Sequence, residues 1–274
     1  MKTGIIIPCY NEGKRLNVNT FIEFITTHSS YHLCFVNDGS KDNTLLVLET
    51  IQKEAKTRVS IVDVKKNAGK AAAVRSGARY LFNRQDVDYI GFIDADLSTD
   101  LSDFKKLVDT LHNDNDLSLV YGSRGKGNGQ IERNVFRNLF SKVVKLIVFL
   151  ILGLPIEDTQ CGAKVFRRSI IPVTYNTKFL TRWLFDVEIF IRLKKHFGKA
   201  QIMNRMYEQP LERWVHVDDS KLGMKDAIQI PYKLLSIWFS YTILQAFSAG
   251  IEKGKLVTLD KMNSSPLYEI KTVS

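Results

Sequence analysis

Two carboxylates one residue apart give this chain its clearest chemical signal. Asp94 and Asp96 follow the apolar run Ile90–Ile93. Alternate side chains of an extended segment point the same way, so both carboxylates can be aimed at one point. Their mutual repulsion is relieved by a cation, and oxygen ligands beside a diphosphate suit Mg²⁺ or Mn²⁺. The pattern predicts a divalent metal site, and the simpler alternative is a loop that caps the helix beginning near Asp100.

Two other loops carry residue types that bind nucleotides. In Asn37–Asp42 a glycine permits a tight turn, and Asp38 could accept a hydrogen bond from a base N–H or a ribose hydroxyl. The alternative there is an ordinary Asp-Gly turn. Gly69-Lys70 precedes an alanine-rich helix, where backbone N–H groups and an ammonium can hold phosphate. The P-loop pattern is absent, so a plain loop before a helix remains the alternative.

Basic residues surround a long amphipathic segment in the second half of the chain. They are Arg124, Lys126, Arg133, Arg137, Lys142 and Lys145. Arg137 and Ser141 are four residues apart and so share a helix face. An apolar stretch, Leu146–Leu152, follows directly. Together they indicate a phosphate clamp beside a membrane surface, with a solvated charged face or a buried core helix as alternatives.

The elements that must position these residues alternate in the first half of the chain. Strands are expected at Gly4–Cys9, His32–Asn37, Val59–Val64, Tyr89–Asp94 and Leu117–Gly122. Segments with apolar residues at helical spacing separate them. This order predicts an α/β fold with a mainly parallel sheet flanked by helices. Polar clusters follow four of the strands, at the edge where open α/β sheets bind ligands.

The second half is less regular. Helices are expected over Glu132–Leu152, Trp183–His196 and Met224–Phe247, the last with a kink at Pro231. A strand is expected over Ala200–Tyr207, and residues 251–274 are expected to form a loosely held tail.

Composition narrows the class of protein. The chain has 274 residues, of which 45% are hydrophobic and 25% charged, with a net charge of +10. This balance excludes a wholly disordered or collagenous protein, and the positive charge predicts an acidic partner. Nucleic acid is not expected, because the basic residues lie beside apolar surface rather than among aromatic side chains. No signal peptide opens the chain, and no stretch reaches the roughly 20 apolar residues of a membrane span.

The three cysteines predict neither a disulfide framework nor a zinc site. Cys9, Cys34 and Cys161 lack the spacing for either, which fits a reducing compartment. Cys161 is expected to be a packed thiol, since no histidine lies near it in the sequence.

The motifs, taken in order, resemble the inverting GT-A glycosyltransferases of family 2, and most of all the polyprenyl- and dolichyl-phosphate sugar synthases. The likeness covers about residues 4–222 and favours the glucosyl branch over the mannosyl branch. The matching motifs are IIIPCYNE (Ile5–Glu12), FVNDGSKDNT (Phe35–Thr44), NAGKAAAVRSG (Asn67–Gly77), IDADLS (Ile93–Ser98), GSR (Gly122–Arg124), DTQCGAKVF (Asp158–Phe166), RWLFDVEI (Arg182–Ile189) and DSKL (Asp219–Leu222).

The resemblance implies roles for individual positions. The residues that would bind the nucleotide sugar are Pro8, Tyr10, Glu12, Asp38, Lys70 and Asp94. Asp96, beside Asp94, would bind the metal, Mg²⁺ or Mn²⁺. The residues that would grip the acceptor phosphate are Arg124, Arg137 and Ser141. Asn37 stands where many relatives have Asp, which leaves Asp38 as the sole acid of its turn.

The implied reaction is hexose transfer from a nucleotide sugar to a lipid phosphate. Glucose from a UDP-hexose is favoured, and mannose from GDP-mannose is the alternative. A phosphate acceptor is already anionic and needs no general base. If the acceptor were instead a saccharide hydroxyl, a base would be required, and Asp186 or Glu188 would supply it next to the acceptor. A nucleotide-binding module without turnover is a third interpretation.

The resemblance also sets expectations for organisation and location. Residues 1–222 would form the glycosyltransferase domain, with a nucleotide-sugar half at about 1–125 and an acceptor half at about 126–222. An amphipathic interfacial helix region would cover 223–250 and the tail 251–274. The protein is expected to lie in the cytoplasm, peripheral on the cytoplasmic face of a membrane. Pairing with a second copy, as a homo-oligomer, is left open.

Overall fold

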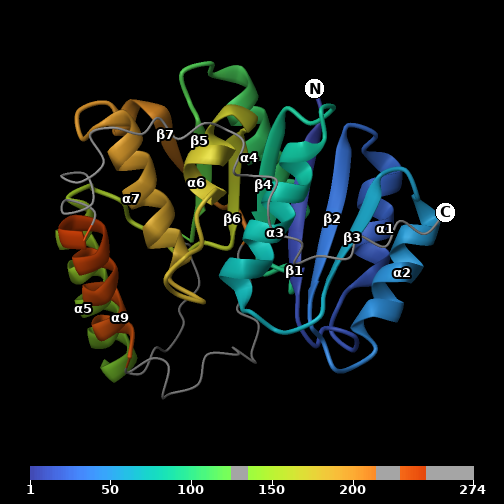
Figure 1. Cartoon of the computed structure of the whole chain (residues 1–274). Helices are drawn as coiled ribbons and strands as arrows, with labels where there is room; N and C mark the ends of the chain where they lie inside the picture. The colour runs from blue at the N-terminus through green and yellow to red at the C-terminus, as the bar shows by residue number, and fades with distance from the viewer. Residues whose placement is uncertain (125–134, 214–228, 245–274) are drawn as a thin grey trace, which may run out of the picture.

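A mostly parallel sheet lies at the centre of the molecule (Figure 1). The computed structural model describes residues 1–124, 135–213 and 229–244. In these residues the sheet has seven strands in the order β3-β2-β1-β4-β6-β5-β7. The strands are β1 (Thr3–Cys9), β2 (Tyr31–Asp38), β3 (Val59–Val64), β4 (Tyr89–Ile93), β5 (Leu119–Ser123), β6 (Ala163–Arg167) and β7 (Met206–Pro210). Strands from both halves of the chain therefore share one sheet.

The five strands expected in the first half are all present, each within about two residues of its predicted ends. The expected parallel pairing is confirmed for β1 with β2, β1 with β4 and β2 with β3. These strands are predominantly apolar, as expected for strands that are covered on both faces of the sheet.

Strand β6 was not predicted, and it runs antiparallel between β4 and β5. It is only five residues long and contains a lysine, so its apolar pattern is weak. The strand predicted over Ala200–Tyr207 is displaced: a 3₁₀ turn covers Ile202–Arg205, and β7 begins only at Met206.

Helices cover both faces of the sheet, and the sheet separates the apolar core into two clusters. One face carries α1 (Val18–Thr27), α2 (Thr44–Glu54) and α4 (Leu101–Asn113). The other carries α3 (Lys70–Asn83), the short α6 (Ile171–Tyr175) and α7 (Phe185–Phe197). This arrangement confirms the predicted α/β class.

Helices α5 (Val135–Leu152) and α9 (Ile230–Phe239) pack against each other at one end of the molecule, next to α7 (Figure 1). The part of the predicted helix before Pro231, residues 224–228, lies outside the described residues, so the kink at Pro231 stays a prediction. Pro231 lies in the first turn of α9, where its missing N–H breaks no helical hydrogen bond. A π-helical turn, Ser240–Leu244, follows α9. Among the described residues, the structure contains no helix with the length and apolar character needed to cross a membrane.

Candidate active site

Asp94 and Asp96 lie where β4 ends, at the sheet edge at which β1 and β2 also end. The chain turns sharply there, because Leu97 adopts a left-handed backbone conformation with φ 52°. The Ser98 N–H then donates to Asp96 Oδ1 at 3.0 Å, and the Leu97 N–H donates to the carbonyl of Asp94 at 3.2 Å. A branched residue in this strained region indicates a turn that the surrounding structure enforces.

Lys70, the first residue of α3, is paired with Asp94. Its Nζ lies 2.5 Å from Asp94 Oδ1. Burial opposes the charge of Lys70, but Asp94, Asp186 and Asp96 outweigh it and raise the pKa of the ammonium. Both carboxylates of the Asp-x-Asp pair therefore lie close enough to one ammonium to stabilise its charge.

A second buried ion pair continues from this one. Asp186, in the first turn of α7, lies 2.7 Å from Nζ of Lys164 on β6, and both side chains are almost completely buried. Lys164 also donates to the carbonyl of Cys161 at 2.6 Å. Burial raises the pKa of Asp186, and the two lysines counteract part of that rise. Negative and positive groups thus alternate from Asp94 to Lys164 beneath the sheet edge.

Lys164 is a residue that the sequence reasoning missed. Its only signal was a lysine within the apolar run of β6, a residue type that is almost never fully buried unless it is paired. Phe92 of β4 lies beneath both ammonium groups, with its ring centroid 5.9 Å from Lys70 Nζ and 5.4 Å from Lys164 Nζ. The ring gives each cation a favourable apolar neighbour.

Asp38 holds the loop that leads into Lys70. Its carboxylate accepts hydrogen bonds from the N–H groups of Ala68 and Gly69, at 2.9 and 2.8 Å, and from the Asn67 side-chain amide at 2.9 Å. Burial raises the pKa of Asp38, and the two N–H groups work against that rise. The structure therefore shows Asp38 bracing the loop 67–70, and its predicted contact with the base or ribose stays a prediction.

Arg182 holds the same loop from the other side. Its guanidinium donates to the Ala68 carbonyl at 3.3 Å and to the Asn67 side-chain oxygen, and its own carbonyl accepts from the Ala71 N–H at 3.1 Å. Gly69 has φ 93°, and a Cβ there would overlap the Arg182 side chain. A glycine is needed at 69 for both reasons.

The other residues predicted to bind the nucleotide reach the same edge. Pro8 and Tyr10 are partly exposed at the end of β1, and Glu12 is buried just beyond. The Glu12 N–H donates to Oγ1 of Thr44 at 2.8 Å, and the Asn11 N–H donates to a serine hydroxyl of the β2–α2 loop at 3.0 Å. These bonds interlock the loops that follow β1 and β2.

Arg124 forms a two-pronged ion pair with Asp158. Its Nε and Nη2 lie 2.6 and 2.7 Å from the two carboxylate oxygens. Burial opposes charge on both groups, but the pairing outweighs it, so the pKa of Arg124 is raised and that of Asp158 lowered. Sequence reasoning quoted Asp158 within a motif and gave it no role. The predicted grip of Arg124 on an acceptor phosphate would share the guanidinium with Asp158.

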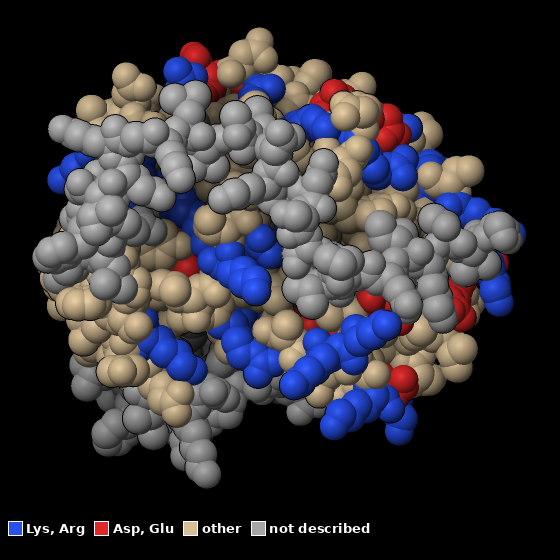
Figure 2. Space-filling view, in the orientation of Figure 1, with Lys and Arg blue, Asp and Glu red and all other residues tan. Residues whose placement is uncertain are grey.

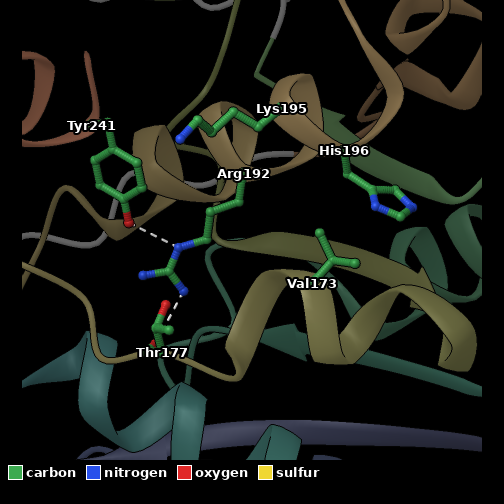
Figure 3. A pocket seen from close by; sticks show the side chains of 6 residues that line it. All are labelled: Val173, Thr177, Arg192, Lys195, His196 and Tyr241. Carbon is green, nitrogen blue, oxygen red and sulfur yellow. Dashed lines mark hydrogen bonds between the residues drawn. The ribbon is translucent and has the colours of Figure 1, made fainter. Parts of the chain in front are cut away.

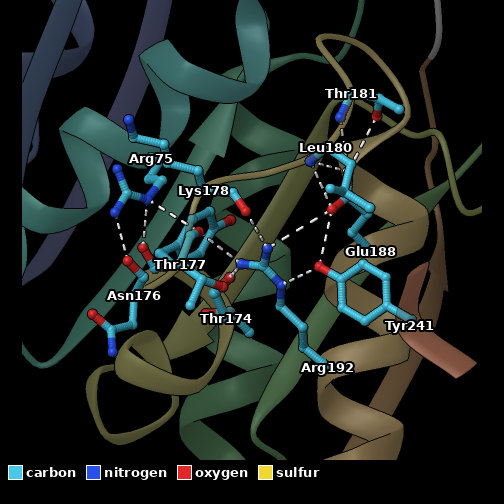
Figure 4. Close-up of polar contacts among 11 residues, drawn as sticks. Arg75, Thr174, Asn176, Thr177, Lys178, Leu180, Thr181, Glu188, Arg192 and Tyr241 are labelled. Carbon is cyan, nitrogen blue, oxygen red and sulfur yellow. Dashed lines mark hydrogen bonds and ion pairs between the residues drawn. The ribbon is translucent and has the colours of Figure 1, made fainter. Parts of the chain in front are cut away.

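Glu188 is buried and saturated with hydrogen bonds (Figure 4). It has 0% exposed surface, and it accepts from the N–H groups of Leu180 and Thr181 at 3.0 and 3.1 Å and from the Tyr241 hydroxyl at 2.9 Å. This geometry offers no oxygen to an acceptor. Arg137 and Ser141 lie on α5, but their side chains lie outside the described residues.

The residues present fit a divalent ion that is shared with a ligand. Within the described residues, no group of three or more His, Cys, Asp or Glu side chains could hold a metal. The carboxylates of Asp94 and Asp96 are hard oxygen ligands at a partly exposed turn. Mg²⁺ and similar ions commonly take one or two carboxylates and complete their shell with water and substrate phosphate.

Positive charge surrounds this edge of the sheet. In Figure 2, Lys and Arg side chains gather over the lower half of the face, toward which the parallel strands run in Figure 1. Exposed basic residues of the two loops that meet there are Lys65, Lys66, Lys178 and Arg182. Such a field attracts an anionic ligand such as a diphosphate.

Comparison with known proteins gives consistent results. A family model described as glycosyl transferase family 2 matches residues 4–173. A dolichyl-phosphate beta-glucosyltransferase of Dictyostelium discoideum is 32% identical over 258 residues, which cover 86% of this chain and 76% of the relative. The enzyme of the same name from Saccharomyces cerevisiae is 30% identical over 262 residues, covering 88% and 75%.

Solved structures share the fold. Glucosyl-3-phosphoglycerate synthase from Mycobacterium tuberculosis in complex with Mn²⁺ and UDP-glucose has a TM-score of 0.64 at 14% identity, covering 88% of this chain and 78% of that one. Its complex with phosphoglyceric acid gives 0.61 at 15%, covering 88% and 79%. The fold is thus the GT-A type that the motifs predicted.

Proposed function

Because this chain belongs to glycosyl transferase family 2 and is a hexosyltransferase, we propose that it transfers glucose from UDP-glucose to the phosphate of a dolichyl-type polyprenyl lipid. One observation carries the proposal: at the carboxyl edge of a GT-A sheet, Lys70 is paired with Asp94, and Asp96 lies in the same turn after β4. The relatives named for this reaction match most of the chain, which supports glucose and a lipid phosphate as the substrates.

The sugar donor would lie across the edge formed by β1, β2 and β4. Pro8, Tyr10 and the loop that Asp38 braces would hold the uridine. A Mg²⁺ or Mn²⁺ ion bound by Asp94 and Asp96 would neutralise the diphosphate and improve it as a leaving group. Lys70 would add a fixed positive charge beside that leaving group.

The transfer exchanges one C–O bond for another. The bond between glucose C1 and the β-phosphate oxygen breaks, and its electron pair leaves with UDP. A phosphate oxygen of the lipid attacks C1 from the opposite face and forms the new bond, which inverts the anomeric centre. Lys70 and the surrounding positive charge would stabilise the departing UDP.

A phosphate acceptor suits the buried carboxylates of this site. A hydroxyl acceptor would need a base to remove its proton, whereas a lipid phosphate is already ionised. Of the two bases expected for a hydroxyl, Glu188 is saturated and Asp186 is paired with Lys164. Arg124 would bind the acceptor phosphate together with Arg137 and Ser141 of α5.

Helices α5 and α9 would bring the site to the lipid at the cytoplasmic face of a membrane. Both present large apolar side chains to solvent: Leu146, Phe149, Leu150, Leu235, Trp238 and Phe239. Apolar residues in such number mark an interaction surface, and aromatic side chains with the exposed Lys145 alongside suit a lipid interface.

The experiment is to incubate the purified protein with UDP-[¹⁴C]glucose, polyprenyl phosphate and Mn²⁺, and then extract with organic solvent. The proposal predicts that label enters the organic phase and that GDP-[¹⁴C]mannose in a parallel reaction gives far less. Label that stays on a water-soluble saccharide would point to a hydroxyl acceptor. Intact UDP-glucose after long incubation would contradict the proposal.

A further inference from the structure

Arg192 fixes residues 174–181, the end of α6 and the irregular segment after it, through their carbonyl groups (Figure 4). The guanidinium donates to the carbonyls of Thr174, Thr177 and Lys178 at 2.6, 3.1 and 2.9 Å. Glu188, one turn earlier on α7, accepts hydrogen bonds from the N–H groups of Leu180 and Thr181 in the same segment. Arg75 of α3 also donates to the carbonyls of Tyr175, Asn176 and Thr177. The segment therefore takes its position from side chains of α7 and α3 rather than from a ladder of its own.

Tyr241 inserts its hydroxyl between these two charged groups. It accepts from Arg192 Nε at 2.8 Å and donates to Glu188 Oε2 at 2.9 Å. Arg192 and Glu188 are themselves 3.8 Å apart, so the hydroxyl bridges them more closely than they pair with each other. Tyr241 comes from the π-helical turn after α9, which makes it a direct polar link from that helix to α7.

The segment held in this way continues directly into the sugar-donor site. Leu180 and Thr181 precede Arg182, which binds the loop 67–70 opposite Asp38. That loop ends in Lys70, which pairs with Asp94. A chain of hydrogen bonds and ion pairs thus runs from α9 to the Asp-x-Asp turn.

The link lies close to the molecular surface on its outer side. An open pocket of about 290 Å³ lies next to Tyr241 and Arg192, and the other lining residues include Lys195 and His196 of α7 (Figure 3). The two hydrogen bonds of the Tyr241 hydroxyl therefore supply a polar part of the contact between the turn after α9 and α7.

We propose that the Tyr241 hydroxyl is a positioning group through which α9 sets the geometry of residues 180–182 and, through Arg182, of the loop 67–70 that holds the sugar donor. The inference rests on the proposed function for the identity of the ligand. It assigns to α9, whose outer face is apolar, a second role in ordering the nucleotide site.

The test is Tyr241→Phe, which keeps the ring and removes only the hydroxyl. Tyr232→Phe, at an exposed tyrosine in the first turn of the same helix, is the matched control. We expect Tyr241→Phe to raise the dissociation constant for UDP with Mn²⁺ roughly tenfold, the scale of one lost buried hydrogen bond, while kcat at saturating UDP-glucose changes little. The control should bind UDP as the wild type does.

Hydrogen exchange supplies a readout that does not depend on activity. In Tyr241→Phe the N–H groups of Leu180 and Thr181 should exchange faster, and so should those of Ala68 and Gly69 in the donor loop. Faster exchange at 180–181 alone, or an unchanged affinity for UDP, would overturn the inference. If the wild type binds no UDP at all, the proposed function fails, and the exchange of 68–69 still decides the coupling.

A second variant keeps the inference testable if Tyr241→Phe does not fold. Thr181→Val removes the hydroxyl that donates to Glu188 at 3.2 Å and leaves Tyr241 in place. It should also speed exchange at Ala68 and Gly69. Unchanged exchange at those two positions in a folded Thr181→Val protein would contradict the coupling.

Discussion

At the scale of single residues, the site depends on partly and fully buried charges of alternating sign, each of which neutralises the next. Asp94, Lys70, Asp186 and Lys164 alternate in sign, and each lies on a different element. Removing one partner would leave the next charge buried and unpaired, which costs far more than the loss of a surface ion pair. The Asp-x-Asp turn is therefore held by electrostatics as well as by its backbone.

The first prediction at this scale concerns the effect of Gly162→Ala on transfer activity. A Cβ at position 162 would overlap the carboxylate of Asp94, so Gly162→Ala must displace that side chain. We expect transfer activity to fall at least about tenfold, since displaced charges weaken the stabilisation of the leaving group. Steady-state kinetics with UDP-glucose checks this.

The matched control is Gly198→Ala, because Gly198 has φ 78° with open space around it. Its strain should lower the free energy of unfolding by about 1 kcal/mol without changing activity. Full activity in Gly162→Ala would show that the Asp94 carboxylate does not need its present position.

His32 makes the protein less stable in mild acid. It is buried on β2 and bonded to the Ser60 hydroxyl at 2.9 Å, and burial together with Arg84 lowers its pKa to about 4. The unfolded chain takes up this proton near pH 6.5 and the folded chain only near pH 4, so stability is lost as the pH falls through that window. The contribution is on the order of 2 kcal/mol between pH 7 and pH 5.

Urea unfolding of wild type and His32→Gln at pH 7 and pH 5 measures how much His32 contributes to the pH dependence of the free energy of unfolding. The pH dependence should be smaller in His32→Gln by that amount, while His196→Gln, at an exposed histidine, should keep the wild-type dependence. An equal pH dependence in all three proteins would show that His32 does not bind protons differently in the two states.

At the scale of elements, the loop 67–70 shows what a sequence can reveal. Its Gly-Lys pair before an alanine-rich helix was readable as an anion site, because helix starts bind anions for local reasons. The two residues that clamp it, Asp38 and Arg182, lie 31 and 114 positions from the atoms they bind. These long-range hydrogen-bond partners depend on the order of the strands in the sheet, and no local sequence pattern encodes them.

The prediction at this scale concerns helices α5 and α9. Phe149→Gln combined with Trp238→Gln removes two large exposed apolar side chains, each worth about 1.5–3 kcal/mol when fully buried. We expect binding to anionic lipid vesicles to weaken at least about tenfold, as measured by co-sedimentation.

Leu46→Gln is the control, because Leu46 is more exposed than either of these residues and lies on α2, at the other end of the sheet. It should leave vesicle binding unchanged. Equal binding by the wild type and the α5–α9 double variant would mean that these helices do not carry the membrane contact.

At the scale of the whole molecule, periodicity predicted strands β1 to β5 well and the strands in the second half of the chain poorly. Strands β1 to β5 are predominantly apolar and are bounded by polar turns, so their pattern is local and strong. Strand β6 lies between β4 and β5 only because the chain returns from α5, and its lysine conceals it in the sequence.

The same contrast applies to the site residues. Asp94 and Asp96 were readable because both lie on one short segment at a strand end. Glu188 was expected next to the acceptor, but its burial and its bonds to Tyr241 depend on packing between α7 and α9. Its residue type and its sequence position could not distinguish a general base from a structural carboxylate that holds a neighbouring segment.

Calorimetric titration with UDP-glucose, with and without Mn²⁺, tests the central claim most directly. Mn²⁺ should tighten binding at least about tenfold in the wild type and should have no such effect in Asp96→Asn, because the variant lacks a carboxylate that would hold the ion. Asp100→Asn, which alters the cap of α4 in the same loop, should retain the Mn²⁺ effect. Equal affinity with and without Mn²⁺, or an undiminished Mn²⁺ effect in Asp96→Asn, would contradict it.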